Sequence, residues 1–358
     1  MDHLLQWGIL GTGRMGQTFA RALSASQTSV LTAVASRQLE SAKCFGGDFL
    51  GERKVLRFGG YEELLACPEV QAVYIATPHP FHARWAIRAA RAGKHVLCEK
   101  PLTLNFPDAA RVVEAARQRG VTLMEAFMYR CHPLLHRLVE LLRDKALGEL
   151  RMIEAYCGFD AGQNYEGRHL KNELGGGGIL GAGCYAVSLA RLAAGVAAGE
   201  EFLDPVEVRA AGHVGPRSRV DEYTFATLKF PNNLLASVGT AMQCRMDNDV
   251  RLYGTAGKIH VPELWVPAEK ANQIILHRYG KPVEDIKVDA PANVYTLEAD
   301  AFAAAVKAGQ AQVAWPAMSW RDTLGNMQTL DRWRADIGVT YEDEKPENRG
   351  GPNDGSGP

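Results

Sequence analysis

Three glycines near the start of the chain have the spacing of a dinucleotide-binding turn. The segment GTGRMG places Gly11, Gly13 and Gly16 at G-x-G-x-x-G spacing, after the apolar run LLQWGIL and before the helical pattern QTFARALSAS. The first glycine permits the bend, the second lets the backbone approach a pyrophosphate, and the third allows close packing of helix on strand. This strand–turn–helix context is the one that the motif requires, so we predict a bound dinucleotide. The other residues of the predicted cofactor-binding turn are Thr12, Arg14 and Met15.

The residues expected to meet the adenosine ribose are Ser36 and Arg37. A chain that binds NAD(H) commonly has Asp or Glu about twenty residues after the glycine turn, where the carboxylate accepts a hydrogen bond from the ribose 2′-hydroxyl. A hydroxyl and a guanidinium suit a 2′-phosphate, which a carboxylate would repel. We therefore predict a preference for NADP(H) over NAD(H). The alternative is that Arg37 is a solvated loop cation.

The elements around this turn alternate between strands and helices. Apolar runs predict strands at 4–10, 30–36, 72–77, 95–101 and 121–127, and amphipathic spacing predicts helices at 17–26, 61–66, 82–93 and 106–120. Continuous apolar runs are typical of parallel strands that are buried on both faces. The first part of the chain is therefore predicted to be an α/β domain with a parallel sheet.

The pattern changes after about residue 151. Longer segments alternate apolar with polar residues and predict strands at 151–159, 207–214, 221–230, 233–243, 250–255 and 257–263. FPNN and GTAGK are predicted hairpin turns, and two amphipathic helices are expected at 296–309 and 319–338. This half is predicted to be an α+β domain with a large open, mainly antiparallel sheet.

These patterns divide the chain into a cofactor domain at 1–125, a substrate and oligomerisation domain at 126–340, and a disordered tail at 341–358, which is rich in Pro, Gly and charge. The last helix, at about 319–336, could pack back on the cofactor domain.

Composition excludes several classes of function. The formal net charge of -1 gives no electrostatic reason to expect a nucleic acid or an anionic membrane as partner. The 7 cysteines are scattered singly, so we expect reduced thiols and no metal site. No signal peptide or membrane span is expected, and the predicted location is the cytoplasm.

Four segments together resemble the glucose–fructose oxidoreductase / inositol dehydrogenase (Gfo/Idh/MocA) family. They are GILGTGRMG, ATPHPFHARWAIRAARAGKHVLCEKPLTLN, LMEAFMYRCHP and ELGGGGILGAGCYAVSLAR. The closest likeness is to the branch with dimeric dihydrodiol dehydrogenase, D-xylose dehydrogenase and 1,5-anhydrofructose reductase. The resemblance implies an N-terminal Rossmann domain and a C-terminal sheet whose outer face forms a homodimer or homotetramer.

The resemblance also assigns residues to the cofactor site. Glu99-Lys100-Pro101 matches the family segment EKP, in which the lysine lies beside the nicotinamide and the substrate and the proline often follows a cis peptide bond. The segment TPHPFH matches TPN-x-x-H, with His79 in place of the usual asparagine. This match adds Thr77, Pro78, His79 and His82 to the expected cofactor contacts. A plain loop role for His79 is an equal alternative.

The remaining matches concern the substrate side. The segment MYRCHP places Arg130 where the family faces the active-site cleft, and a structural ion pair is the alternative to a cofactor or substrate contact. A loop downstream resembles the family's substrate loop. Its expected substrate contacts are Phe159, Asp160, Asn164 and Arg168.

The family pattern D-x-G-x-[HY] after the glycines supplies a catalytic acid and, four residues later, a histidine or tyrosine. Here Tyr185 is present and the acid position is Gly181. We expect Tyr185 to move the hydroxyl proton during hydride transfer. Lys100 is expected to favour the phenolate, lower the pKa of Tyr185 and bind the substrate oxygen.

Gly181 leaves several alternatives open. A substrate with a bulkier ring could occupy the vacated volume, an acid from elsewhere could replace the missing one, or the chain could be an NADP(H)-binding sensor without catalysis. An NAD-dependent glycosidase is a further alternative. The expected substrate, a sugar or a cyclic diol, follows from the resemblance.

Overall fold

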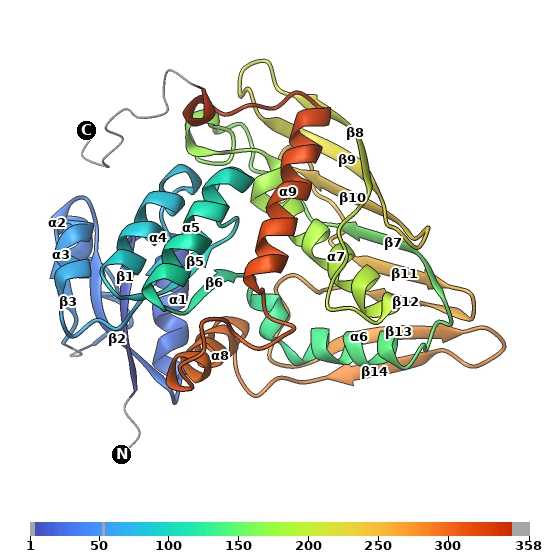
Figure 1. Ribbon diagram of the computed structural model, residues 1–358, viewed down its shortest axis with the longest axis horizontal. Helices are drawn as coiled ribbons and strands as arrows, with labels where there is room; N and C mark the ends of the chain where they lie inside the picture. The colour runs from blue at the N-terminus through green and yellow to red at the C-terminus, as the bar shows by residue number, and fades with distance from the viewer. Residues whose placement is uncertain (1–3, 52–53, 346–358) are drawn as a thin grey trace. The chain divides into compact units, whose positions relative to one another are not determined.

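A computed structural model describes residues 4–51 and 54–345 of the chain, in two compact units. Of the described residues, the first unit contains those up to 128 and the segment 295–323, and the second contains 129–294 and 324–345. Figure 1 follows the chain through both units. Because two segments after residue 294 belong to different units, neither unit is a single continuous stretch.

The first unit is built on a parallel sheet of six strands in the order β3-β2-β1-β4-β5-β6. The strands are β1 (Leu5–Leu10), β2 (Ser29–Ala35), β3 (Leu56–Phe58), β4 (Ala72–Ile75), β5 (His95–Glu99) and β6 (Leu123–Ala126). Five of them were predicted from apolar runs. The edge strand β3 was not, because it has only three residues and none of them is buried.

Helices cover both faces of this sheet. They are α1 (Arg14–Ala25), α2 (Leu39–Lys43), α3 (Tyr61–Ala66), α4 (His82–Arg91), α5 (Phe106–Arg119) and α8 (Val294–Lys307). Trp7 of β1 contacts Phe19 of α1 and Phe302 of α8 at ring-centroid distances of 5.1 and 5.2 Å. Thr296 also donates a hydrogen bond to the carbonyl of Ala22 at 3.0 Å, so α8 completes the core beside α1 although it is far away in sequence.

The strand order reverses between β1 and β4, which are hydrogen-bonded neighbours in the sheet. All of the strands run in parallel, so their carboxyl ends lie along one edge. In open α/β sheets ligands bind outside the carboxyl ends of the strands, at such a reversal. The glycine turn follows β1, and the predicted loops with Thr77 and Lys100 follow β4 and β5, so the topology collects them at this edge.

The second unit contains an eight-stranded sheet in the order β14-β13-β12-β11-β7-β10-β9-β8. The strands are β7 (Leu150–Tyr156), β8 (Glu207–Val214), β9 (Asp221–Lys229), β10 (Leu235–Ala241), β11 (Val250–Gly254), β12 (Gly257–Val261), β13 (Asn272–Arg278) and β14 (Glu284–Val288). All neighbours are antiparallel except β7 and β10, which confirms a mainly antiparallel sheet. The two strands β13 and β14 were not predicted, because neither alternates regularly between apolar and polar residues.

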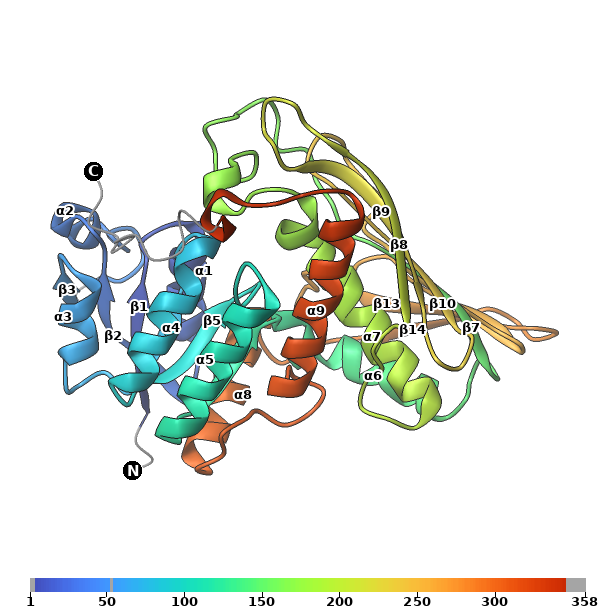
Figure 2. The same ribbon diagram turned by 45° about the horizontal axis from the view of Figure 1, so that its top comes forward.

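Helices cover one face of this sheet (Figure 2). They are α6 (Pro133–Arg143), α7 (Cys184–Ala198) and the part of α9 (Trp320–Asp336) that belongs to this unit. Trp333 of α9 donates a hydrogen bond to the Thr224 hydroxyl on β9 at 3.0 Å. On the opposite face of the sheet, Figures 1 and 2 draw no helix from the described part of this unit.

Short helical turns connect these elements. They are η1 (His79–Phe81), η2 (Met128–Cys131), η3 (Asn172–Leu174), the π-helical turn η4 (Ile179–Gly183) and η5 (Glu342–Glu344). The start of the predicted tail is therefore ordered: Tyr341 is buried, and Glu344 pairs with Arg334. Residues 346–358, the rest of that prediction, lie outside the described residues.

The stretch Asn172–Ala198 is long and apolar enough to cross a membrane by length and composition alone. Of its most apolar window, 94% is buried inside the structure. Packing against the sheet therefore accounts for its apolar character.

Candidate active site

The glycine turn has the steric properties of a pyrophosphate site. Gly11 has a φ of 110°, and a Cβ atom there would lie 2.7 Å from the carbonyl oxygen of Ala76. A Cβ at Gly16 would collide with the carbonyl oxygen of Gly11, so this glycine allows α1 to approach the turn. At Gly13, the N-cap of α1, nothing lies within 4 Å of the position of a Cβ. Open space in front of the helix N-terminus is what an anionic phosphate requires.

The end of β2 lies beside this turn. The hydroxyls of Thr12 and Ser36 are 3.5 Å apart, and the Ser36 backbone N–H is bonded to the carbonyl of Phe58 on β3. Arg37 is exposed, and its charge counteracts the burial that raises the pKa of Tyr61. The Ser36 hydroxyl therefore lies beside the turn where the ribose is predicted, and the exposed Arg37 is the next residue along the chain.

Thr77 and His82 organise the loop after β4. Both ring nitrogens of His82 lie 2.8 Å from backbone carbonyls, Nδ1 from that of Pro101 and Nε2 from that of Thr77. His82 is fully buried and joins the β4 loop to the β5 loop, while its cofactor contact stays a prediction. The buried Thr77 hydroxyl makes no hydrogen bond with any described residue, so it has capacity to bind a ligand group. His79 is buried in η1, with its ring 5.6 Å from that of His82.

Lys100 follows β5 and is joined to Pro101 by a cis peptide bond, as expected. Its backbone N–H donates to Oε2 of Glu99 at 3.2 Å, and the hydroxyl of Tyr74 donates to Oε1 of the same carboxylate. Glu99 is thus held from two sides at the base of the Lys100 loop.

Two buried acidic side chains of the first unit, Glu99 and Glu298, lie close enough for their charges to interact. Burial and the nearby charge of Glu99 raise the pKa of Glu298 on α8 well above its ordinary value. Tyr74 and Glu298 are not among the predicted site residues, because each lies inside an apolar pattern that is typical of a core.

Tyr185 lies in the second unit, at the second residue of α7. Its ring is 5.9 Å from those of Tyr129 and Trp265, and these two rings are 5.6 Å apart. The side chain is 8% exposed, so most of the ring is packed. The preceding turn, Ile179–Gly183, is π-helical, and such turns are frequent at functional sites.

Arg130 is fully buried within the second unit. Its Nη2 atom donates to the hydroxyl of Ser188 at 2.7 Å and to the Ser188 carbonyl at 2.8 Å, and its Nε atom donates to the Tyr129 hydroxyl at 3.0 Å. These bonds to neutral groups tie η2 to α7 one helical turn after Tyr185. A cofactor contact of Arg130 stays a prediction.

The predicted substrate loop follows β7. Phe159 is 38% exposed and packs edge-on against His169 at 5.0 Å, and Asp160 accepts a hydrogen bond from the Gly162 N–H at 2.8 Å. Asn164 and Arg168 are exposed. The structure places these four side chains in the same loop of the second unit, and their contact with substrate remains a prediction.

The glycines before Tyr185 are not equivalent. A Cβ at Gly176 would lie 2.7 Å from the carbonyl oxygen of His169, and one at Gly178 would lie 2.8 Å from Thr240. At Gly177, where φ is 100°, it would collide with a carboxylate oxygen of Asp221. At Gly181 the nearest neighbour is the methyl group of Met242, at an ordinary 3.6 Å. The fold therefore requires glycine in the loop but not at the position of the family acid.

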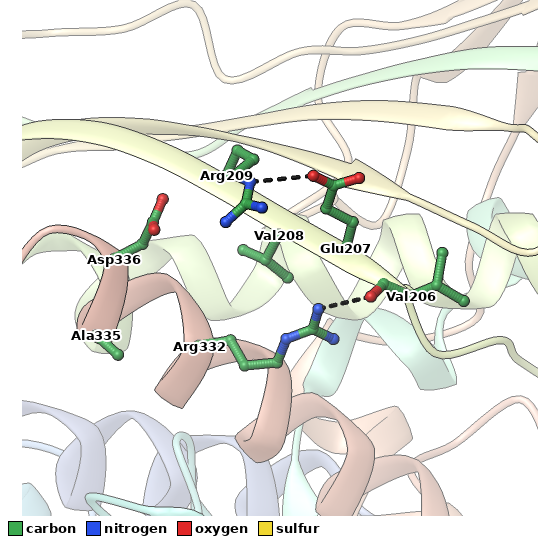
Figure 3. Close-up of a pocket in the computed structure, with 7 residues that line it drawn as sticks. All are labelled: Val206, Glu207, Val208, Arg209, Arg332, Ala335 and Asp336. Atoms are coloured by element: carbon green, nitrogen blue, oxygen red, sulfur yellow. Dashed lines mark hydrogen bonds and ion pairs between the residues drawn. The ribbon is translucent and has the colours of Figure 1, made fainter.

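A surface cavity of about 410 Å³ lies away from these residues (Figure 3). It lies between β8 and the end of α9, where Arg332 donates to the carbonyls of Pro205 and Val206 at 2.6 and 2.9 Å. Asp336 accepts the backbone N–H of Ala210 at 2.5 Å. The cavity is thus the seam along which α9 covers the edge strand of the sheet, and none of the predicted site residues lines it.

Within residues 4–51 and 54–345 there is no cluster of three or more His, Cys, Asp or Glu side chains that could hold a metal ion. The donors at the carboxyl edge of the first unit fit a dinucleotide instead. Open space at Gly13, the exposed guanidinium of Arg37 and the unpartnered hydroxyl of Thr77 are the observations that match such a ligand.

Each of the two units matches a known protein family model. Residues 5–127 match a family model described as an oxidoreductase family with an NAD-binding Rossmann fold, and residues 135–260 match the GFO/IDH/MocA C-terminal domain. The chain is 31% identical over 346 residues to a trans-1,2-dihydrobenzene-1,2-diol dehydrogenase of Danio rerio, covering 95% of this chain and 99% of that protein.

Two further relatives are similar over nearly the whole chain. A D-xylose 1-dehydrogenase (NADP(+)) of Haloferax volcanii is 32% identical over 91% of this chain and 95% of its own. A 3-ketoreductase from Actinomadura kijaniata, solved in complex with NADP and TDP-benzene, superposes with a TM-score of 0.81 at 29% identity over 94% of this chain and 98% of its own. The chain therefore belongs to the Gfo/Idh/MocA family of NAD(P)-dependent oxidoreductases.

Proposed function

We propose that this protein is an NADP(H)-dependent oxidoreductase that acts on a carbinol or carbonyl carbon of a sugar or cyclic polyol. The observation that carries the proposal is the glycine turn at the reversal of the parallel sheet. Its first and third glycines are required by the fold, while its second faces open space at a helix N-terminus. That combination favours a bound pyrophosphate over a purely structural turn.

The preference for NADP(H) is supported by Ser36 and Arg37 at the end of β2. No carboxylate stands at these two positions to repel a 2′-phosphate or to hold a 2′-hydroxyl. A guanidinium binds a phosphate through charge-assisted hydrogen bonds, which are stronger than neutral ones. The Haloferax and Actinomadura relatives are also described with NADP.

The bound nicotinamide would supply or accept the hydride, and the chain must then supply a proton donor and acceptor. We assign this role to Tyr185, since it follows the glycine loop at the position where the family has histidine or tyrosine. Its packing between Tyr129 and Trp265 restricts the ring to few orientations. Lys100, on the loop after β5, is assigned to binding the substrate oxygen and stabilising the phenolate.

The substrate class is supported by what the relatives act on. They include dehydrogenases of a cyclic dihydrodiol and of D-xylose, and a 3-reductase of a dTDP-linked dideoxy-didehydroglucose. These compounds share a ring or chain with adjacent oxygen-bearing carbons. Phe159, Asp160, Asn164 and Arg168 are the residues that we assign to binding such hydroxyls.

The decisive experiment is a screen of NADPH oxidation and NADP⁺ reduction over aldoses, anhydro-ketoses and cyclic dihydrodiols, with NADPH binding measured separately by fluorescence. We expect binding and turnover of at least one compound. Binding without turnover of any compound would favour a sensor, and cleavage of a glycoside with retained NAD(H) would favour a glycosidase. Absence of NADPH binding would overturn the proposal.

We further propose that the protein forms a homo-oligomer through the open face of the eight-stranded sheet. The outward-facing residues of its central strands include Met152, Tyr223, Phe225 and Leu235, which are 41–51% exposed. Rows of exposed large apolar side chains on a flat sheet are typical of a protein interface. The location proposed for this assembly is the cytoplasm, where free thiols such as Cys44 and Cys244 stay reduced.

A further inference from the structure

A single buried carboxyl group holds the start of the helix that carries Tyr185. Asp221, the first residue of β9, is fully buried, and its Oδ2 atom accepts the backbone N–H of Ile179 at 2.6 Å. The backbone N–H of Gly178 also stabilises the charged form of this carboxyl. A negative charge at the first turn of a helix is favourable because the free N–H groups and the helix dipole point at it.

The loop approaches this carboxyl so closely that only glycine fits. A Cβ at Gly177 would collide with Oδ1 of Asp221, and a Cβ at Gly178 would lie 3.2 Å from Oδ2. The run of glycines before Tyr185 is thus explained by a contact with a residue more than forty positions later in the chain.

The other carboxylate oxygen of Asp221 has no hydrogen-bond partner in the part of the chain that the structure describes. Oδ1 is buried and makes no hydrogen bond with any described residue. An unsatisfied buried oxygen is costly when the group is charged. Burial accordingly raises the pKa of Asp221 to about 7, although the backbone N–H groups of Ile179, of Asp221 itself and of Gly178 and the charge of Arg334 oppose the rise. Both protonation states are therefore populated near neutral pH.

The charged groups around Asp221 are already paired. Arg334 of α9 forms ion pairs of 2.8 Å with Asp331 and with Glu344, and its guanidinium lies 4.9 Å from the centre of the Tyr341 ring. On the sheet side, Glu222 lies 3.7 Å from His213 and accepts the Ser218 hydroxyl at 2.9 Å. These pairings leave the two loop N–H groups, together with the backbone N–H of Asp221 itself, as the bonded partners of the Asp221 carboxyl.

A second contact fixes the same loop. The buried hydroxyl of Tyr341 donates to the carbonyl of Gly176 at 2.7 Å. The loop is thus held at its carbonyl side by Tyr341 and at its N–H side by Asp221. From there the π-helical turn leads directly into α7, so a shift of the loop moves Tyr185.

We propose that Asp221 is a positioning residue for Tyr185, which fixes the first turn of the helix through the backbone N–H groups of Gly178 and Ile179. The inference rests on the proposed role of Tyr185 in proton transfer. The ionised carboxyl binds the two N–H groups through charge-assisted bonds, and the neutral acid binds them more weakly. Loss of a well-fixed geometry costs an enzyme up to about a hundredfold in rate.

The test compares wild type with Asp221→Asn between pH 5.5 and 8.5, using NADP(H) and the compound turned over fastest in the screen. We expect kcat of the wild type to rise through an inflection near pH 7. Asp221→Asn lacks that inflection, and its kcat at pH 8 is about 10–100-fold below that of the wild type. The KM for NADP(H) is unchanged, because the cofactor turn is in the other unit. Glu222→Gln, which removes the neighbouring carboxylate, keeps the wild-type profile.

A measurement without substrate complements the kinetics. Amide hydrogen exchange of residues 178–182 is expected to be at least about tenfold faster in Asp221→Asn than in wild type, since the loop opens locally. Tyr341→Phe should also accelerate this exchange but keep the inflection of kcat near pH 7. It therefore tests whether fixing this loop matters even if Asp221→Asn does not fold.

An unchanged profile and unchanged exchange in Asp221→Asn, or no inflection near pH 7 in the wild type, would overturn the inference. Tyr185→Phe measured in parallel separates the two ideas. If that variant retains full turnover, the proposed function of Tyr185 is wrong. If Tyr185→Phe is inactive while Asp221→Asn behaves like the wild type, only the positioning role of Asp221 is refuted.

Discussion

The proposed chemistry of this protein depends most directly on the hydroxyl of Tyr185. Removing it in Tyr185→Phe keeps the ring packed against Tyr129 and Trp265, so the fold is expected to be unchanged. Turnover should fall by about 10²–10⁴, which is the usual contribution of a positioned acid or base. Steady-state kinetics with NADPH binding as a control would measure the effect. Tyr253→Phe removes a hydroxyl bonded to Glu154 on the open sheet face and should leave kcat unchanged.

Glycine is required at one position of the loop and dispensable at another. Gly181→Ala adds a methyl group in ordinary contact with Met242, at a helical residue without a positive φ. It should stabilise the protein by about 0.5–1 kcal/mol, because alanine loses less backbone entropy than glycine. In Gly177→Ala the added methyl group collides with Asp221, at a residue whose φ is 100°. This substitution should destabilise the protein by at least about 1 kcal/mol. Urea unfolding of the pair tests this. Equal effects would contradict it.

The cofactor preference is expected to depend on Arg37. Arg37→Asp replaces a cation beside the glycine turn by a charge that repels a 2′-phosphate and suits a 2′-hydroxyl. The KM for NADP⁺ should rise about 10–100-fold, while that for NAD⁺ stays the same or falls. Arg91→Asp, an exposed arginine in the last turn of α4, is the matched control. A wild-type enzyme that prefers NAD⁺ would refute the prediction.

At the scale of elements, the contact between β9 and the loop before α7 is expected to make the free energy of unfolding depend on pH. The pKa of Asp221 is raised from 3.8 to about 7 in the folded protein, so the folded state binds the extra proton between these values. Its contribution to stability is therefore full below about pH 4 and is lost as the pH rises to 7.

Asp221→Asn cannot titrate, so the difference between the two proteins isolates this effect. From pH 5 to pH 8 the free energy of unfolding of Asp221→Asn should rise relative to wild type by roughly 3 kcal/mol. Urea unfolding at the two pH values measures it, and a difference that does not change with pH would show that the carboxyl does not titrate in this range. The ionised form thus costs stability while it fixes the helix.

At the scale of the whole molecule, the open sheet face is expected to be an interface between copies of the chain. Phe225 is 51% exposed, and its ring lies 5.7 Å from that of Tyr156. We expect light scattering to give a multiple of the 39.1 kDa chain mass for wild type and the monomer mass for Phe225→Glu. Leu39 is an exposed side chain of α2 in the first unit, and Leu39→Glu should leave the oligomer intact. A monomeric wild type would refute the interface.

The sequence by itself determined the parallel sheet, the glycine turn and the predominantly antiparallel second sheet. Gly11, Gly13 and Gly16 could be assigned roles because strand, turn and helix follow one another directly between residues 4 and 26. The cis bond before Pro101 was also expected, from the family segment EKP. These features depend on the order of neighbouring residues, which a sequence displays directly.

Only the tertiary structure decided why the loop before Tyr185 consists of glycines. Asp221 contacts that loop from 42 residues further along the chain, and Tyr341 contacts it from 165 residues away. The tertiary structure was also needed to find the hydrogen bond between Arg130 and the Ser188 hydroxyl and the strands β3, β13 and β14. Hydrophobic periodicity reports whether a side chain faces a core, but not which distant polar group meets it there, because that pairing arises only when the separate elements pack.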